Sequence, residues 1–175
     1  MRTTLLRRKR KQLRILIAGL GNPLLRDDGV GVQAAQELKK EPPPGVLIVE
    51  VGTAVLDALH LFSWADKILA LDAMKAGGSP GTIYSFRRDD VVDAGPQASL
   101  HEVNLLRALR LIPENPQPEI MILGVEPEII DFGLNLSPTV QCALPRLLEE
   151  IRKIVLQWLV HYPSRKFSFS IDSNQ

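Results

Sequence analysis

The spacing of apolar residues changes several times along the chain and divides it into alternating strand-like and helix-like segments. Four largely apolar runs have the length of strands, at residues 13–18, 46–51, 67–71 and 119–125. Such runs are typical of strands that a parallel sheet buries on both faces. Residues 82–86 alternate between apolar and polar positions instead, which predicts an edge strand with one solvated face.

Helical spacing of apolar residues predicts four helices, over about residues 28–40, 53–64, 99–111 and 138–159. Ser99 and Glu102 have the spacing of a capping box, and Ser137 precedes a proline at the first position of the last helix. Strands that alternate with helices form a mostly parallel sheet covered on both faces. We therefore predict an α/β fold, a three-layer αβα sandwich whose mostly parallel sheet has about five strands.

The 175 residues are enough for one domain, which we place at residues 14–162. Residues 1–13 are predicted to be a disordered basic tail, and residues 163–175, polar and rich in serine, a loose tail. Residues 1–14 hold seven of the 21 Lys and Arg side chains and no acid, so the remainder has a net charge of −6. An acidic body argues against a nucleic-acid partner.

Cysteine use and hydropathy give a prediction for the compartment. Cys142 is the only cysteine, which excludes a disulfide framework and a thiolate metal site. It falls within the last predicted helix, where we interpret it as an inert core thiol. No apolar run approaches the roughly 20 residues that span a bilayer, and no signal peptide is recognisable. We therefore predict a cytoplasmic protein without membrane insertion.

Polar groups with metal-binding chemistry fall where predicted strands end. Asp27 and Asp28 follow the first strand after a glycine-rich turn, Asp72 closes the third strand, and His101 lies near the start of the third helix. In a parallel α/β sheet these ends meet at one rim, where ligands bind. One imidazole and two carboxylates suit a divalent ion such as nickel, zinc, manganese or iron, and leave coordination positions open.

A second interpretation of these residues is purely structural. An aspartate at the start of a helix is commonly an N-cap or a partner of the helix dipole, which applies well to Asp27 and also to Asp28. His101 could be a surface residue. Asp72 is harder to explain in this way, because a carboxylate that closes a buried strand needs a partner or a metal. The residues alone leave both interpretations open.

Other candidate sites are weaker. The GLG of residues 19–21 could start a dinucleotide fingerprint, but Leu24 occupies the third glycine position and two acids follow. No nucleophile elbow is present in the sequence. His60 and His161 lie in amphipathic helices, where we interpret them as structural or solvated.

With these residues in view, the chain resembles the hydrogenase maturation endopeptidases over about residues 14–160. The resemblance rests on GLGNPLLRDDGVG at residues 19–31, Gly52-Thr53, Leu71-Asp72-Ala73, Ser99-Leu100-His101-Glu102 and GVEPE at residues 124–128. It departs from the family at the second loop, which reads Glu50-Val51-Gly52-Thr53 in place of an acid and two glycines. These enzymes remove the C-terminal extension of the large subunit of nickel–iron hydrogenases after nickel insertion.

The resemblance implies that Asp28, Asp72 and His101 bind nickel and are the catalytic residues. The nickel would be carried by the precursor of the large subunit, and another divalent ion could replace it in the isolated protein. Some relatives have glutamate at the first position, so the side chain of Asp28 is one methylene shorter than the corresponding ligand of those relatives. A metal can polarise the scissile carbonyl and activate water, and a carboxylate could instead act as general base. The protein is expected to be a monomer.

Two other functions remain open at the sequence level. Peptidyl-tRNA hydrolase also begins with a strand and GLGNP, but its catalytic histidine segment is absent here, where LLRDD stands at residues 24–28. A nickel-sensing protein that binds the hydrogenase subunit without cutting it is the non-catalytic alternative, because no nucleophile is evident.

Overall fold

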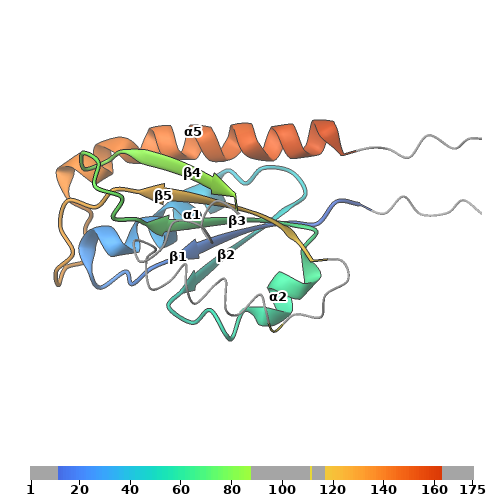
Figure 1. The fold of residues 1–175 in the computed structure, drawn as a ribbon, viewed down its shortest axis with the longest axis horizontal. Coiled ribbons are helices and arrows are strands. Elements are labelled where there is room, and N and C mark those ends of the chain that lie inside the picture. The colour runs from blue at the N-terminus through green and yellow to red at the C-terminus, as the bar shows by residue number, and fades with distance from the viewer. Residues whose placement is uncertain (1–11, 88–110, 112–116, 163–175) are drawn as a thin grey trace, which may run out of the picture.

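The computed structural model describes residues 12–87, 111 and 117–162, and its centre is a five-stranded sheet (Figure 1). The strand order is β2-β1-β3-β5-β4. The strands are β1 (Ile15–Leu20), β2 (Val46–Gly52), β3 (Lys67–Ala73), β4 (Ile83–Arg87) and β5 (Glu119–Val125). The described helices are the 3₁₀ helix η1 (Arg26–Gly29) and the α-helices α1 (Val30–Lys40), α2 (Leu59–Trp64) and α5 (Pro138–His161).

The sheet is mixed and mostly parallel, as the sequence predicts. Strands β2, β1, β3 and β5 run parallel, and β4 pairs antiparallel with β5 at one edge. The predicted edge strand is confirmed, since β4 has only half-buried and exposed residues. The carboxyl ends of β1, β3 and β5 point to the same side of the molecule, at the left of Figure 1.

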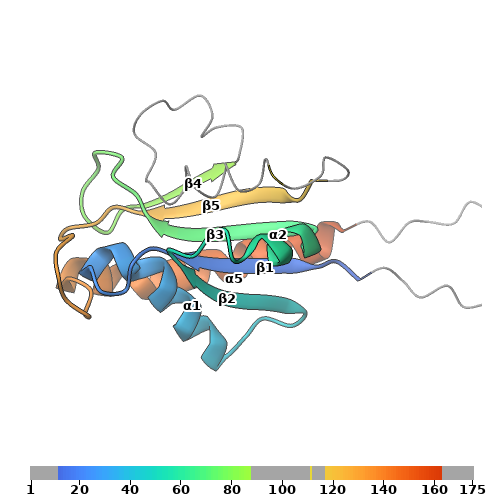
Figure 2. The ribbon, with the colours of Figure 1, turned by 90° about the horizontal axis from the view of Figure 1, so that it is seen from below.

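Helices cover both faces of the sheet and create two apolar cores. One core lies between the sheet and helices α1 and α5, with Ala35 and Ile151 among its fully buried members. The other lies under α2, around Phe62. Figure 2 shows α2 on the opposite side of the sheet from α1 and α5. The predicted three-layer arrangement is therefore confirmed.

The predicted elements differ from the observed ones mainly at their ends. Helix α2 begins at Leu59 rather than near Thr53, because residues 54–59 form turns in which several amides donate to the carbonyl three residues earlier, such as Asp57 N to Ala54 O at 3.1 Å. The helix predicted at residues 99–111 and its capping box lie outside the described residues apart from Leu111. The predicted N-cap of α5 is confirmed, since the Ser137 side chain accepts from the Val140 amide.

The expectation for Cys142 is wrong. Helix α5 directs Val140, Leu144, Leu147 and Ile151 into the core, whereas Cys142 is exposed. Helical spacing explains the error, because position 142 falls between the buried positions 140 and 144 and therefore points away from the sheet.

The predicted tails lie almost wholly outside the described residues, since residues 1–11 and 163–175 are not among them. None of the described helices is long and apolar enough to cross a membrane.

Candidate metal-binding site at the carboxyl ends of the strands

The glycine motif after β1 brings Asp28 and Asp72 to one place. A Cβ atom built on Gly21 would lie 1.8 Å from the carbonyl oxygen of Asp28 and 3.4 Å from Oδ1 of Asp72. Gly21 also has φ = +100°, a conformation that other residues rarely adopt. Only glycine can therefore stand between the Asp28 backbone and the Asp72 carboxylate.

Asp28 is held by the turn that precedes it. It lies in η1, half-buried, and its Oδ2 accepts a hydrogen bond from the Asn22 amide at 2.7 Å. The Asp28 amide in turn donates to the Leu25 carbonyl at 3.1 Å. The carboxylate is therefore positioned beside Gly21 and Asn22 and keeps some contact with solvent.

Asp72 is placed by the centre of the sheet. It pairs in register with Gly124 of β5 and is only 1% exposed, and its Oδ1 accepts from the Ala73 amide at 2.9 Å. Strand β3 continues for one residue beyond it, to Ala73, rather than ending on it. Since β1 pairs with β3 only as far as Leu71, Asp72 stands just past the paired part of β1, where Gly21 begins the turn.

The last glycine of the motif lets α1 approach the sheet. A Cβ on Gly31 would come within 2.1 Å of the Leu71 carbonyl oxygen. Helix α1 therefore packs with its first turn directly on the backbone of β3, next to Asp72. Because the same contact fixes the start of α1, it also fixes η1 and Asp28 relative to Asp72.

The expectation that Asp27 caps a helix is wrong, although its structural role is confirmed. Asp27 is fully buried, and its Oδ1 accepts from the Ser137 amide at 2.6 Å. Its Oδ2 accepts from the Ser137 hydroxyl and from the amides of Glu128 and Ile129, at 2.8 to 2.9 Å. The carboxylate thus binds the loop between β5 and α5 (residues 126–137) instead of the start of its own helix, whose N-cap residues have no side-chain bond.

Glu126 is a second buried anchor, and the sequence analysis did not identify its role. It is 7% exposed, and its Oε2 accepts from the Ala76 amide at 2.8 Å, the Gly78 amide at 3.2 Å and the Tyr84 hydroxyl at 2.8 Å. It therefore holds the loop that follows Asp72 (residues 74–82). Its position in the sequence, directly after a buried strand, could have indicated this role, because Asp27 and Asp28 lie close to the end of a strand in a similar way.

The hydrogen bonds around Glu126 determine its ionisation. Burial alone would raise the pKa of the carboxyl, but the bonds from the Ala76 amide, the Tyr84 hydroxyl and the neighbouring glycine amides together lower it. The pKa of Tyr84 is raised by burial and by its bond to Glu126. Glu126 is therefore a charged acceptor whose oxygen is already used by three donors, which makes it a loop anchor rather than a metal ligand.

Of the three predicted ligands, two lie among the described residues. Gly21 stands between the backbone carbonyl of Asp28 and the carboxylate of Asp72, whereas His101 lies outside the described residues. In residues 12–87 and 117–162, no three His, Cys, Asp or Glu side chains are grouped closely enough to hold a metal ion. Carboxylates are hard oxygen donors that suit a divalent cation, so the residue types of Asp28 and Asp72 are compatible with the predicted metal, and their role as ligands stays a prediction.

The other two histidines are surface residues, as expected. The Nδ1 atom of His60 lies 3.0 Å from the carbonyl oxygen of Asp57, and that of His161 lies 2.8 Å from the carbonyl oxygen of Gln157. Both side chains are exposed and bond only within their own helical turns.

Comparison with known proteins gives a consistent family. A family model described as hydrogenase maturation protease matches residues 32–154. Hydrogenase 2 maturation protease of Escherichia coli K12 is 32% identical over 146 residues, which are 79% of this chain and 88% of that protein. The hydrogenase expression/formation protein HupD of Bradyrhizobium diazoefficiens is 28% identical over 83% of this chain and 79% of its own length.

Solved structures agree with the sequence matches. The hydrogenase maturating endopeptidase HybD from E. coli superposes with a TM-score of 0.75 and 27% identity, covering 83% of this chain and 93% of that one. The [NiFe] hydrogenase maturation protease HybD from Thermococcus kodakarensis gives a TM-score of 0.72 and 26% identity, covering 81% and 99% of the two chains. The similarity in fold therefore covers about four fifths of this chain.

The chain belongs to the hydrogenase maturation protease family. It is a hydrogenase maturation endopeptidase, and its function is to process the C-terminus of the large subunit of a nickel–iron hydrogenase. The predictions of family, enzyme class and function are thus confirmed. The alternatives of a peptidyl-tRNA hydrolase and of a non-catalytic nickel sensor are not supported by these matches.

Proposed function

We propose that Asp28, Asp72 and His101 form the site at which this endopeptidase binds the nickel of its precursor and cleaves the C-terminal extension. The observation that carries the proposal is the position of Gly21, whose Cβ would touch both the Asp28 backbone carbonyl and Oδ1 of Asp72, so that the two residues flank the same turn. Both carboxylates lie at the end of the sheet where α/β proteins bind ligands. His101 would add the nitrogen ligand.

The acids near this rim have different roles, which supports Asp28 rather than Asp27 or Glu126 as a metal ligand. Asp27 and Glu126 are each committed to three or more hydrogen-bond donors of adjacent loops. Asp28 is half-buried, whereas Asp27 is fully buried. Asp27 is therefore the anchor, and Asp28, which solvent can reach, is the better candidate for contact with the precursor.

The nickel would arrive with the precursor rather than belong to this chain. Nickel bound by two carboxylates and one imidazole keeps open positions, and a metal there can polarise a peptide carbonyl and activate water. The chain's own residues would seat the metal, orient the tail against the rim and supply a carboxylate as proton acceptor. Cleavage would then depend on completed metal insertion, because a nickel-free precursor offers nothing for the carboxylates to bind.

The setting of the reaction follows from the composition. We place the enzyme in the cytoplasm as a monomer, with the precursor as its partner and without nucleic acid or membrane insertion. The single cysteine and the net charge of −6 outside residues 1–14 support this assignment.

Intact-mass analysis of a large-subunit precursor incubated with the purified protein tests the proposal. The nickel-loaded precursor is expected to lose its C-terminal extension, and the nickel-free precursor is the matched control and should keep its mass. Binding of the loaded precursor without any mass loss would favour a nickel sensor. Equal cleavage of both precursors would show that nickel is not what the site recognises.

A further inference from the structure

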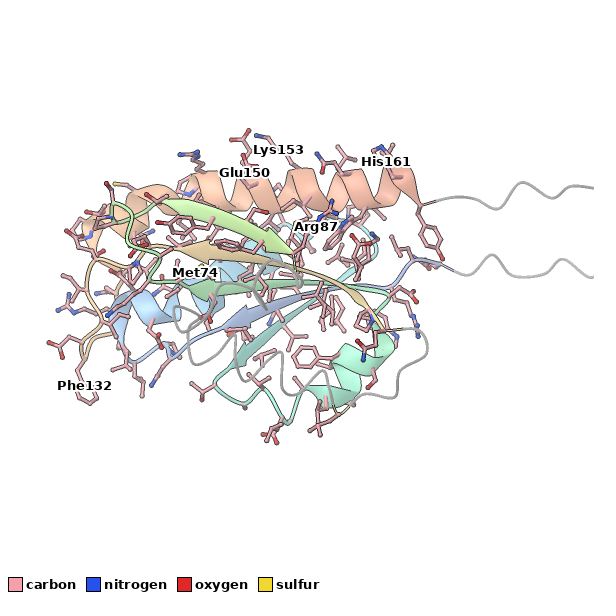
Figure 3. All side chains as sticks on the ribbon, in the orientation of Figure 1. Met74, Arg87, Phe132, Glu150, Lys153 and His161 are labelled. Carbon is pink, nitrogen blue, oxygen red and sulfur yellow. The ribbon has the colours of Figure 1, made fainter. Side chains whose placement is uncertain are left out.

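Large apolar side chains gather on the loop between β5 and α5 and on the turn after β1. Phe132 is 81% exposed, Leu134 69% and Leu24 55%, and Ile129 and Ile130 are also exposed. We call these five residues the rim patch. Figure 3 labels Phe132 at the end of the molecule where the strands β1, β3 and β5 finish, with its side chain directed away from the sheet.

The rim patch is built on a well-connected backbone. The Gly133 amide donates to the Leu24 carbonyl at 2.9 Å, and the Arg26 amide donates to the Gly133 carbonyl at 2.9 Å. These two bonds join the two segments of the patch, so Leu24 lies beside residues 132–134. Arg26 adopts a left-handed backbone conformation, with φ = 46°, where its amide makes this hydrogen bond.

A buried charge holds the same loop. Asp27 accepts from the amides of Glu128 and Ile129 and from both polar groups of Ser137, so it fixes the loop on both sides of Phe132. Hydrogen bonds to a buried carboxylate are among the stronger ones in proteins. The chain therefore uses a buried aspartate to keep apolar side chains in water, which is unfavourable for the isolated protein.

The patch is continuous with the candidate metal site. The Asp28 amide donates to the Leu25 carbonyl, one residue from Leu24, and Asp28 itself contacts Gly21. A protein that covered the rim patch would therefore lie next to Asp28, the half-buried acid of the candidate site. Exposed apolar side chains grouped in this way mark interaction surfaces, and aromatic and aliphatic anchors commonly dominate the binding energy.

We propose that the rim patch is the docking surface for the folded body of the large-subunit precursor, beside the rim where its C-terminal extension is cut. This inference rests on the proposed function and adds a second contact to it. Glu128 and Asp131 are exposed among the apolar side chains, so the complementary surface of the precursor is apolar with basic residues at its border. The patch would orient the C-terminal extension of the precursor across Asp28, and the metal site would bind the nickel of the loaded precursor.

Steady-state cleavage of the nickel-loaded precursor distinguishes docking from chemistry. The test variant carries Phe132→Ser and Leu134→Gln. The control carries Leu156→Gln and Val160→Gln, two residues of α5 that are 61% and 70% exposed. We expect the test variant to raise KM by roughly tenfold or more, with kcat and thermal unfolding unchanged, and the control to match the wild type.

A charge variant provides an independent measurement. Glu128→Lys keeps the amide that donates to Asp27 and reverses the exposed charge. It is expected to raise KM and to weaken the effect of added salt on KM, because the new positive charge offsets the negative charge of Asp131 and leaves little attraction to be screened at high ionic strength. If neither KM nor its dependence on salt changed, a contact between Glu128 and basic residues of the precursor would be excluded.

The outcomes separate this inference from the proposed function. Normal cleavage by the wild type together with a wild-type KM for the test variant overturns the docking surface and leaves the metal site standing. Absence of cleavage by the wild type overturns the proposed function and the inference that rests on it. Sedimentation of the wild type as a dimer that the test variant converts to a monomer would assign the patch to a second copy and overturn the proposal.

Discussion

Asp27 binds Ser137, 110 residues later in the chain, through both carboxylate oxygens, with Oδ1 2.6 Å from the Ser137 amide and Oδ2 2.8 Å from its hydroxyl. The next residue, Asp28, instead accepts from Asn22 and lies against Gly21 with Asp72. Two adjacent aspartates therefore have separate purposes. One joins the loop before α5 to the glycine motif, and the other stands at the candidate metal site.

Asp27→Asn should destabilise the protein by about 2–4 kcal/mol. An amide group would place a donor against one of the amides or the hydroxyl that now donate to Asp27, and the buried site gives neither group access to water. Urea unfolding measures the loss. Asp28→Asn is the matched control and should change stability much less, because Asp28 is half-buried. Equal losses in the two variants would contradict the assignment of Asp27 as the anchor.

Gly21→Ala should prevent the native contact between the turn and η1, because its Cβ would lie 1.8 Å from the Asp28 carbonyl oxygen. The comparison is Gly77→Ala, which also has positive φ, +82°, but has no atom within 4 Å of the added Cβ. Gly77→Ala should cost only about 1 kcal/mol of backbone strain. The free energies of unfolding of the two variants check this difference, and similar values would show that the close contact at Gly21 relaxes easily.

Glu126→Gln should change how stability depends on pH. The folded-state pKa of Glu126 lies below 4.5, so its charge stabilises the fold above that value and the contribution is lost as the pH falls through the folded-state pKa. The advantage of the wild type over Glu126→Gln should therefore shrink as unfolding is measured at decreasing pH from neutrality. An advantage that is constant with pH would mean that the hydrogen bonds, which Gln can partly keep, matter and the charge does not.

Much of the fold was predictable because it depends on local periodicity. The strand at residues 119–125 and the cap at Ser137 were predicted with their observed bounds, since apolar runs and capping residues act over a few positions. Position 142 was assigned to the wrong face because its neighbours in sequence, not its angle around the helix, guided the interpretation. Helix α2 starts late because consecutive turns compete with helix at residues 54–59.

The candidate site was predictable only in part. Strand ends indicated Asp28 and Asp72, and both residues flank Gly21 in the fold, Asp28 through its backbone carbonyl and Asp72 through its carboxylate. The partners of Asp27 and Glu126 could not be predicted, because they are loop amides more than 40 residues away whose positions depend on the folded backbone. Whether His101 completes the site remains a prediction, since it lies outside the described residues.

The most direct test of the account is the intact mass of the nickel-loaded precursor after incubation with folded Asp72→Asn protein. The variant keeps the size of the side chain and removes its charge, and Asp57→Asn, at an exposed position outside the predicted ligand set, is the control. We predict that the Asp57→Asn protein removes the C-terminal extension at the wild-type rate and that the Asp72→Asn protein leaves the precursor at full mass. Normal cleavage by a well-folded Asp72→Asn protein would contradict the assignment of the site.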